Sequence, residues 1–171
     1  MSALRPASGE PFPSFSFETL ANGRIAFDTL PGWRLLVVYR GRHCPICKTY
    51  LKGLDGLLGE FADAGIAVYA VSADPKERAE AEAAQEGWRF PVGHDFVMAD
   101  MQRLGVYISK PRSPEETDRP FAEPAVFVVN PEGRLQVVDI SNAPFARPDL
   151  AGLLRGLKFV QAKNYPPRGT A

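Results

Sequence analysis

The order of apolar and polar segments along the chain predicts an α/β sandwich built on a mixed central β-sheet. Two apolar runs, at residues 35–39 and 65–74, are each followed by a helical pattern, which favours neighbouring parallel strands. Alternating patterns at residues 13–30 and 124–141 predict a β-hairpin on either side of this unit. Because hairpins pair antiparallel, we expect helices to flank a mixed sheet with an N-terminal hairpin extension.

Composition indicates one ordinary domain and excludes several classes of protein. The chain has 171 residues, 45% of them hydrophobic, so it can bury a core without disulfides or metals. We expect a single domain at 11–161, between a loose arm at 1–10 and a polar tail at 162–171. Twenty basic residues balance twenty acidic ones, which gives no general attraction to nucleic acid or an anionic membrane. With no apolar run near the roughly 20 residues of a membrane helix and no signal-peptide core, we expect a cytoplasmic protein.

The first half of the chain contains five expected elements, each with a local signal. They are a hairpin at 13–30, a strand at 35–39, a helix reaching about residue 64, a strand at 65–74 and a helix at 75–86. Alternation on both sides of Ala21-Asn22-Gly23 indicates the hairpin, and continuous apolar runs indicate strands covered on both faces. The second helix has charges at helical spacing after Pro75, a residue that suits a first turn.

Patterns in the second half predict shorter elements and a closing hairpin. "FPVGHD" indicates a short strand and turn, "MADMQRLGVY" a short helix, and the polar, proline-rich residues 110–120 a loop. The turn Asn130-Pro131-Glu132-Gly133 joins two strands within residues 124–141. Residues 148–161 are amphipathic and predict a final helix.

Both cysteines lie where the apolar run at 35–39 gives way to the first helix. Extending the apolar period of that helix backwards places Cys47 on its buried stripe. Cys44 falls at the start of the first turn, where backbone N–H groups have no helical partners. Pro45 suits that turn, because its missing N–H is not needed there. We expect the two sulfurs to come within bonding distance, with Cys44 exposed and Cys47 shielded.

This placement is typical of a reactive thiol. A Cys44 thiolate would accept hydrogen bonds from free N–H groups at the positive end of the helix dipole. Basic side chains nearby in the sequence, namely Arg40, Arg42, His43 and Lys48, would add positive potential. Such surroundings lower a thiol pKa from roughly 8.5 into the range of about 3.5–7.5. The interpretation is that Cys44 is the nucleophile and Cys47 the resolving thiol that closes a disulfide.

Two other interpretations of the pair remain. Both cysteines can be inert core residues, since free cysteine is often buried. They can also be half of a zinc site, but only His43 and His94 are available as nitrogen ligands and there is no second C-x-x-C. The coincidence of strand, C-x-x-C and helix start favours redox chemistry over both.

The arrangement resembles the thioredoxin superfamily, and more narrowly the peroxiredoxin-like proteins of the alkyl hydroperoxide reductase/thiol-specific antioxidant (AhpC/TSA) family. The segment "PFPSFSFETLANGRIAFDTLPGWRLLVVYRGRHCPIC" resembles that family's N-terminal hairpin, first core strand and active-site turn. "IAVYAVSAD" is similar to its second core strand, and "EPAVFVVNPEGRLQVVDIS" to its closing hairpin. The resemblance covers residues 11–161 and implies a thioredoxin-like fold and an antioxidant oxidoreductase.

Three positions depart from the patterns of these relatives. Peroxiredoxins have a proline seven residues and a threonine three residues before the reactive cysteine, where this chain has Val37 and Gly41. They also have an arginine before the closing-hairpin strand, where this chain has Pro124. Thioredoxins carry a buried aspartate six residues before the first cysteine, and here that residue is Val38. The chain therefore lacks part of the equipment of both relatives.

The resemblance also suggests roles for residues around the pair. Pro124 resembles the cis-proline of thioredoxins, and we expect a cis Glu123–Pro124 bond facing the cysteines. Arg40 and Arg42 flank Gly41 in the turn before Cys44. They either stabilise the thiolate or substrate or are two solvated charges on a loop, and for the first role Arg42 is slightly favoured for its exposure near Cys44. His43 is either a proton donor near neutral pH or a solvated surface residue.

Two activities compete within this interpretation, and a third class remains. In a peroxidase, Cys44 attacks a hydroperoxide and Cys47 condenses with the sulfenic acid. In a disulfide reductase, Cys44 attacks a disulfide and Cys47 resolves the mixed disulfide. A redox-sensing or binding module would keep the disulfide without turnover. The family resemblance favours the peroxidase, with a thioredoxin- or glutaredoxin-like electron donor, no cofactor and no metal.

Glycines recur every three residues in the first predicted helix. Gly53, Gly56 and Gly59 each cost roughly 1 kcal/mol relative to alanine. Close packing on the sheet, or a helix–helix contact in a homodimer, would offset this loss.

Overall fold

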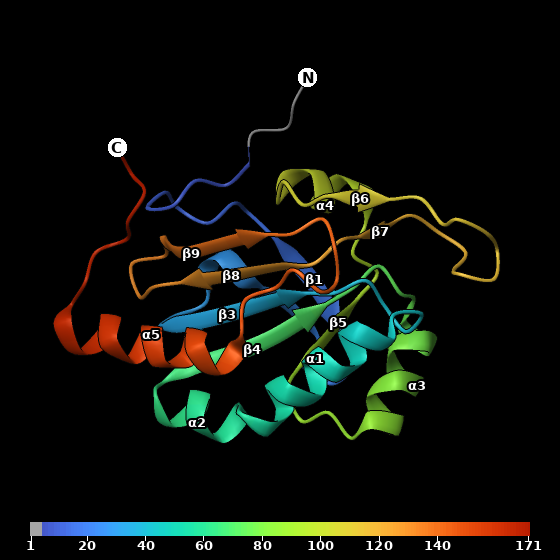
Figure 1. The fold of residues 1–171 in the computed structure, drawn as a ribbon, viewed down its shortest axis with the longest axis horizontal. Coiled ribbons are helices and arrows are strands. Elements are labelled where there is room, and N and C mark those ends of the chain that lie inside the picture. Colours follow the sequence, from blue (N-terminus) through green and yellow to red (C-terminus); the bar gives the residue numbers. More distant parts are fainter. Residues whose placement is uncertain (1–4) are drawn as a thin grey trace.

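A mixed sheet with helices on one side and a more irregular layer on the other forms the body of the protein (Figure 1). The structure is a computed structural model and describes residues 5–171. Its strands are β1 Ser16–Thr19, β2 Arg24–Ala26, β3 Trp33–Val38, β4 Ile66–Val71, β5 Val92–His94, β6 Ile108–Ser109, β7 Phe121–Ala122, β8 Ala125–Val129 and β9 Leu135–Ile140. Its α-helices are α1 Pro45–Gly56, α2 Leu58–Asp63, α3 Lys76–Glu86, α4 Met98–Arg103 and α5 Leu150–Lys163, and Phe27–Thr29 form a short 3₁₀-helix.

Seven strands pair in the order β2-β1-β5-β4-β3-β8-β9. β3, β4 and β5 run parallel, as expected for strands linked through helices, and the outer strands are antiparallel. β6 and β7 form a separate two-stranded pair. The mixed α/β sheet and both hairpins predicted from the sequence are confirmed.

The central strand β3 is buried on both faces, and its side chains divide between two cores. Leu35 and Val37 pack with the apolar faces of α1, α3 and α5. Leu36 and Val38 pack on the opposite face with the N-terminal phenylalanines and the α4 region. Tyr39 follows β3 directly and is fully buried in the first core. Residues 40–44, here called the cysteine turn, therefore leave the sheet from a strand that is buried on both faces.

The first helix is shorter than predicted. The sequence pattern indicates one helix reaching about residue 64, but α1 ends at Gly56 and α2 begins at Leu58. Leu57 between them has φ −100° and ψ 1°, outside the helical region. Three glycines within seven residues give this segment low helix propensity, which accounts for the break.

The two ends of the described chain lie against the sheet edge formed by β9. The backbone N–H of Gly9 donates to Leu135 O at 2.8 Å, and Pro11 bridges Arg134. Near the C-terminal end, the Tyr165 carbonyl accepts a hydrogen bond from the side-chain amide of Gln136 in β9. Across residues 5–171, no helix is long and apolar enough to span a membrane.

Candidate active site

Cys44 caps the first helix with its own sulfur. It has an extended backbone (φ −111°, ψ 101°), and its Sγ accepts a hydrogen bond from the Cys47 backbone N–H at 3.3 Å. Pro45 occupies the first helical position, where its missing N–H leaves no gap in the hydrogen bonding. The cap position normally favours serine, threonine, aspartate or asparagine, whose oxygens accept this bond. Here the Cys44 sulfur takes their place.

Both cysteines are buried, and both are reduced. Cys47 is fully shielded, as predicted, and lies in the core beneath α1. The expectation of an exposed Cys44 is wrong, because only 2% of its surface is accessible. Its sulfur turns towards the first turn of α1, and this orientation is what gives it the hydrogen bond from Cys47.

The environment separates the acidities of the two thiols. The pKa of Cys44 is lowered to about 6, chiefly because the Cys47 thiol donates a hydrogen bond to it, with help from the Cys47 N–H and from Arg40. The pKa of Cys47 is raised, because its hydrogen bond to Cys44 holds its proton and because it is buried. One thiol is therefore poised as a nucleophile at neutral pH while the other keeps its proton.

Arg40, and not Arg42, is the arginine at the thiolate. Its guanidinium pairs with Glu123 at 3.2 Å and with Glu116 at 3.6 Å, and it lies over the Phe121 ring at 4.9 Å. These contacts aim it at Cys44, whose pKa it lowers. The Arg42 side chain is exposed, as the sequence predicted, but among the two arginines only Arg40 contributes to the lowered pKa of Cys44. The role predicted for Arg42 in stabilising the thiolate or substrate stays a prediction.

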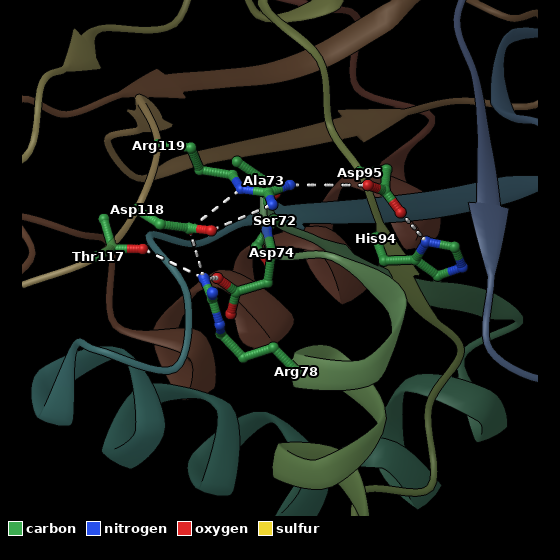
Figure 2. A network of polar contacts seen from close by, with 9 residues as sticks. All are labelled: Ser72, Ala73, Asp74, Arg78, His94, Asp95, Thr117, Asp118 and Arg119. Atoms are coloured by element: carbon green, nitrogen blue, oxygen red, sulfur yellow. Dashed lines mark hydrogen bonds and ion pairs between the residues drawn. The ribbon is translucent and has the colours of Figure 1, made fainter. Parts of the chain in front are cut away.

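The cysteine turn is anchored by the buried carboxylate of Asp74, whose ion pair with Arg78 is drawn in Figure 2. Asp74, at the end of β4, accepts the Arg42 backbone N–H at 2.8 Å and an Arg78 N–H at 3.3 Å. Its oxygens also lie 2.8–2.9 Å from where a Cβ on Gly41 would stand, and Gly41 has φ +134°. A side chain at this position would collide with the carboxylate, so the missing threonine reflects a different local construction.

Arg78 connects this anchor to the loop at 110–120. It donates to Thr117 at 3.2 Å and to Asp118 at 3.0 Å, while Arg119 pairs with Asp118 and Asp95 (Figure 2). The same loop supplies Glu116 to Arg40. Two arginines thus join the loop at 110–120 to the cysteine turn: Arg78 through Asp74, and Arg40 through Glu116.

His43 and Pro124, the two remaining sequence candidates, have other contacts than those expected. The His43 ring packs edge-on against Phe121 at 4.6 Å, and burial together with Arg40 lowers its pKa. A neutral imidazole at neutral pH argues against a role as a cationic acid. Pro124 directly precedes β8 beside the end of β3, but its peptide bond is trans, so the expectation of a cis bond is wrong. Its carbonyl instead accepts the Ser141 N–H, which fixes the strand end.

Arg147 contacts Cys47, and sequence reasoning missed it. Its guanidinium lies 3.4 Å from the Cys47 Sγ and 4.2 Å from the centre of the Tyr50 ring. It precedes α5, one hundred residues from Cys47 in the chain, and no local pattern marks it. Glu123, Glu116 and Asp74 were missed for the same reason. No local sequence pattern marks these residues, because the arginine that each of them contacts in the cysteine turn is distant in sequence.

An open groove of about 720 Å³ begins beside Arg147. It runs between α1 and the segment before α5, and most of its lining is apolar. Ile46 and Phe145 on its rim are exposed, at 46% and 79%. Gly53 lines it, but an added Cβ at Gly53, Gly56 or Gly59 would meet nothing within 4 Å. Close packing on the sheet therefore does not explain the glycines.

A buried carboxylate lies behind the pair on α3. Glu82 is 1% exposed, and its nearest cation is Lys48 with Nζ 3.9 Å away. Burial, followed by the charge of Asp74, raises its pKa to about 7. Within residues 5–171, no group of three or more His, Cys, Asp or Glu side chains has the arrangement of a metal site.

Comparison with known proteins decides the family. The model of the AhpC/TSA family matches residues 8–138. The chain belongs to this family. Its members are thiol-dependent peroxidases. A curated relative, alkyl hydroperoxide reductase C of Pseudomonas aeruginosa, is 30% identical over 155 residues. The match covers 86% of this chain and 78% of that protein. The family resemblance inferred from sequence is confirmed.

Solved structures of peroxiredoxins share the fold. Peroxiredoxin 6 of Arenicola marina, as a cysteine-to-serine mutant, matches with a TM-score of 0.76 at 24% identity, covering 93% of this chain and 75% of its own. AhpC of Mycobacterium tuberculosis matches with a TM-score of 0.73 at 22% identity, covering 92% and 99%. The thioredoxin-like fold of this AhpC/TSA protein is thereby confirmed.

Substitution of Gly41 tests the anchor. Gly41→Ala should lower the free energy of unfolding by about 1–3 kcal/mol, because the new side chain requires a strained backbone and meets Asp74. Gly53→Ala is the matched control and should raise it by about 1 kcal/mol, since its Cβ meets nothing and helix propensity improves. Chemical denaturation measures both. Equal effects of the two changes would contradict the anchor.

Glu82 should make the protein less stable as pH rises. A carboxyl whose folded pKa is about 7 and unfolded value about 4.5 binds more protons in the folded state between these values. The free energy of unfolding should therefore fall from pH 4.5 to 7, by about 3 kcal/mol through this group. Glu82→Gln should remove that part of the fall, and the exposed Glu80→Gln should not. An unchanged pH profile in Glu82→Gln would rule out the shift.

Proposed function

We propose that this AhpC/TSA protein is a peroxidase in which Cys44 attacks a hydroperoxide and Cys47 resolves the product. The observation that carries the proposal is the Cys44 sulfur at the helix start, with its pKa lowered to about 6 beside a protonated, shielded Cys47. A thiolate forms the S–O bond while the O–O bond breaks, and the alcohol leaves with a proton from solvent. Cys47 then displaces the sulfenic hydroxyl as water, closing the disulfide.

Arg40 is the side-chain donor best placed for this reaction. Negative charge develops on the leaving oxygen as the O–O bond breaks, so donors aimed at it lower the barrier. Gly41 and Pro124 supply no side-chain donor at the positions where peroxiredoxins carry threonine and arginine. The Arg40 guanidinium, held by Glu116 and Glu123, provides the positive potential instead. With fewer donors, we expect slower peroxide reduction than in peroxiredoxins with the full motif.

Disulfide reduction is the second candidate, favoured by the groove beside Cys47. Its apolar lining and the exposed Phe145 suit a segment of a protein partner. The same surface would serve a thioredoxin- or glutaredoxin-like donor that returns Cys44 and Cys47 to the dithiol. A redox-sensing module without turnover remains the third candidate. Because reduction by such a donor needs a reducing compartment, we include a cytoplasmic location in the proposal.

Peroxiredoxin relatives commonly form homodimers. We include a homodimer of this chain in the proposal. Gel filtration and sedimentation of the reduced and oxidised protein would test it.

The order of thiol acidities is directly measurable. The ultraviolet absorbance of the thiolate in the reduced protein should titrate with a midpoint at about pH 6, because the Cys47 hydrogen bond and Arg40 lower the Cys44 pKa. Cys44→Ser should abolish that transition, while Cys47→Ala should move it to higher pH because the hydrogen bond donated by the Cys47 thiol is lost. If Cys47→Ala alone abolished it, the roles of the two cysteines would be reversed.

Arginine variants separate the two activities. Arg40→Ala should slow oxidation of the reduced protein by hydrogen peroxide roughly 10²–10³-fold, as expected when one donor to a developing oxyanion is removed. The exposed Arg42→Ala serves as the matched control and should change this rate little. Stopped-flow kinetics measures the peroxide step, and insulin reduction provides the rival assay. If peroxide reacted no faster than with a free thiol of the same pKa while insulin was reduced readily, the protein would be a disulfide reductase.

A further inference from the structure

The Arg147 guanidinium is fixed against Cys47 by contacts with three neighbours. Its Nη1 donates a hydrogen bond to the Cys47 Sγ at 3.4 Å, and its Nε donates to the Pro144 carbonyl at 2.8 Å. The group also lies over the Tyr50 ring, 4.2 Å from its centre. The Tyr50 hydroxyl in turn donates to the Pro148 carbonyl at 2.7 Å. The guanidinium is therefore held between α1 and the segment before α5.

The partners of Arg147 are a carbonyl and a sulfur, whereas Arg40 pairs with the carboxylates of Glu116 and Glu123. The Nη2 of Arg147 is buried and has no hydrogen-bond partner within residues 5–171. Buried polar groups are almost always paired, so this exception calls for an explanation. A cation placed in this way keeps its charge and a free donor available to an anion that forms beside it.

In the reduced protein the negative charge of the cysteine pair lies on Cys44 and not on Cys47. The Cys47 thiol donates a hydrogen bond to Cys44, and this bond together with burial raises the Cys47 pKa, although the charge of Arg147 acts in the opposite direction. The Cys44 anion has its own donors in the Cys47 backbone N–H and Arg40. Arg147 therefore has no anion to stabilise until Cys44 is oxidised.

Oxidation of Cys44 moves the demand for a cation to Cys47. As a sulfenic acid, Cys44 is neutral, so the negative charge that disfavours ionisation of Cys47 is gone. Cys47 must now supply the electron pair that displaces the sulfenic hydroxyl, and its sulfur gains negative charge as its proton leaves. That sulfur is fully shielded from water, and a buried charge is costly unless it is paired.

We propose that Arg147 is the catalytic cation of the resolving step, where it stabilises the negative charge that develops on Cys47. This proposal rests on the peroxidase mechanism above and assigns a residue to its second half. The Cys47 sulfur forms the S–S bond while the S–O bond of the Cys44 sulfenic acid breaks. The Cys47 proton leaves with the departing hydroxyl as water, so no further reactant is consumed. Arg40 thus serves the first step and Arg147 the second.

Quenched-flow oxidation of the full chain separates the two steps. With hydrogen peroxide in excess, the rate at which the Cys44 sulfenic acid forms scales with peroxide concentration. The rate at which the disulfide closes does not, because that step is intramolecular. Mass spectrometry of samples quenched in acid distinguishes the two products, so both rate constants follow from one time course.

Arg147→Met should slow disulfide closing roughly 10²-fold, the lower end of the loss when one donor to a developing anion is removed, because sulfur is a weaker acceptor than oxygen. Sulfenic acid formation should be little changed, which also shows that the variant folds. Slower closing leaves the sulfenic acid open to a second peroxide, so Arg147→Met should form more sulfinic acid. Arg155→Gln, which removes an exposed arginine on α5, is the matched control and should change neither step.

Arg147→Lys separates charge from packing. Lysine keeps the positive charge but not the planar group that lies on Tyr50 and reaches Pro144, so it should restore most of the closing rate lost in Arg147→Met. The proposal is overturned if the disulfide closes as fast in Arg147→Met as in the parent protein. It is also overturned if Arg147→Lys is as slow as Arg147→Met, since packing would then account for the loss. Absence of any peroxide-dependent sulfenic acid in the parent protein would instead overturn the peroxidase itself.

Discussion

A single hydrogen bond, from the Cys47 backbone N–H to the Cys44 sulfur, organises this site. It exists because β3 ends in a turn that delivers Cys44 to the cap position of α1. Asp74 holds that turn through the Arg42 backbone N–H. Glu116 and Glu123 hold the Arg40 guanidinium, which lowers the Cys44 pKa. Without the turn, the sulfur would lose its backbone donor, the neighbouring thiol and Arg40 together, and its acidity would return towards that of an ordinary cysteine.

The polar groups around Cys44 come from other positions in this chain than in peroxiredoxins. Peroxiredoxins place functional side chains at the two positions that are Gly41 and Pro124 here. In this chain the Asp74 carboxylate stands beside Gly41, where such a side chain would point. Pro124 gives its carbonyl to Ser141, while Glu123 before it holds Arg40. The same region of the fold is therefore built from a different set of partners.

Local signals predicted the scaffold well, and long-range contacts account for what they missed. Apolar periodicity placed the strands and put Cys47 on a buried face, because both properties depend on neighbours within a few residues. The burial of Cys44, the choice of Arg40 and the presence of Arg147 depend on segments up to one hundred residues away. The cis form of the Glu123–Pro124 bond was inferred from a distant resemblance, and the bond is trans in this chain. The single long helix failed because three glycines outweigh a continuous apolar stripe.

The use of sulfur as a helix cap has a consequence for how the protein moves. With its pKa lowered to about 6, a reduced Cys44 is an anion at neutral pH and accepts the Cys47 backbone N–H in the first turn of α1. Side-chain caps formed by serine, threonine, aspartate or asparagine are typically worth about 0.5–2 kcal/mol to a helix. Once the sulfur is tied into a disulfide it is a neutral, weaker acceptor. Each turnover then loosens and retightens the start of α1, so that amide hydrogen exchange there would record the oxidation state of the protein.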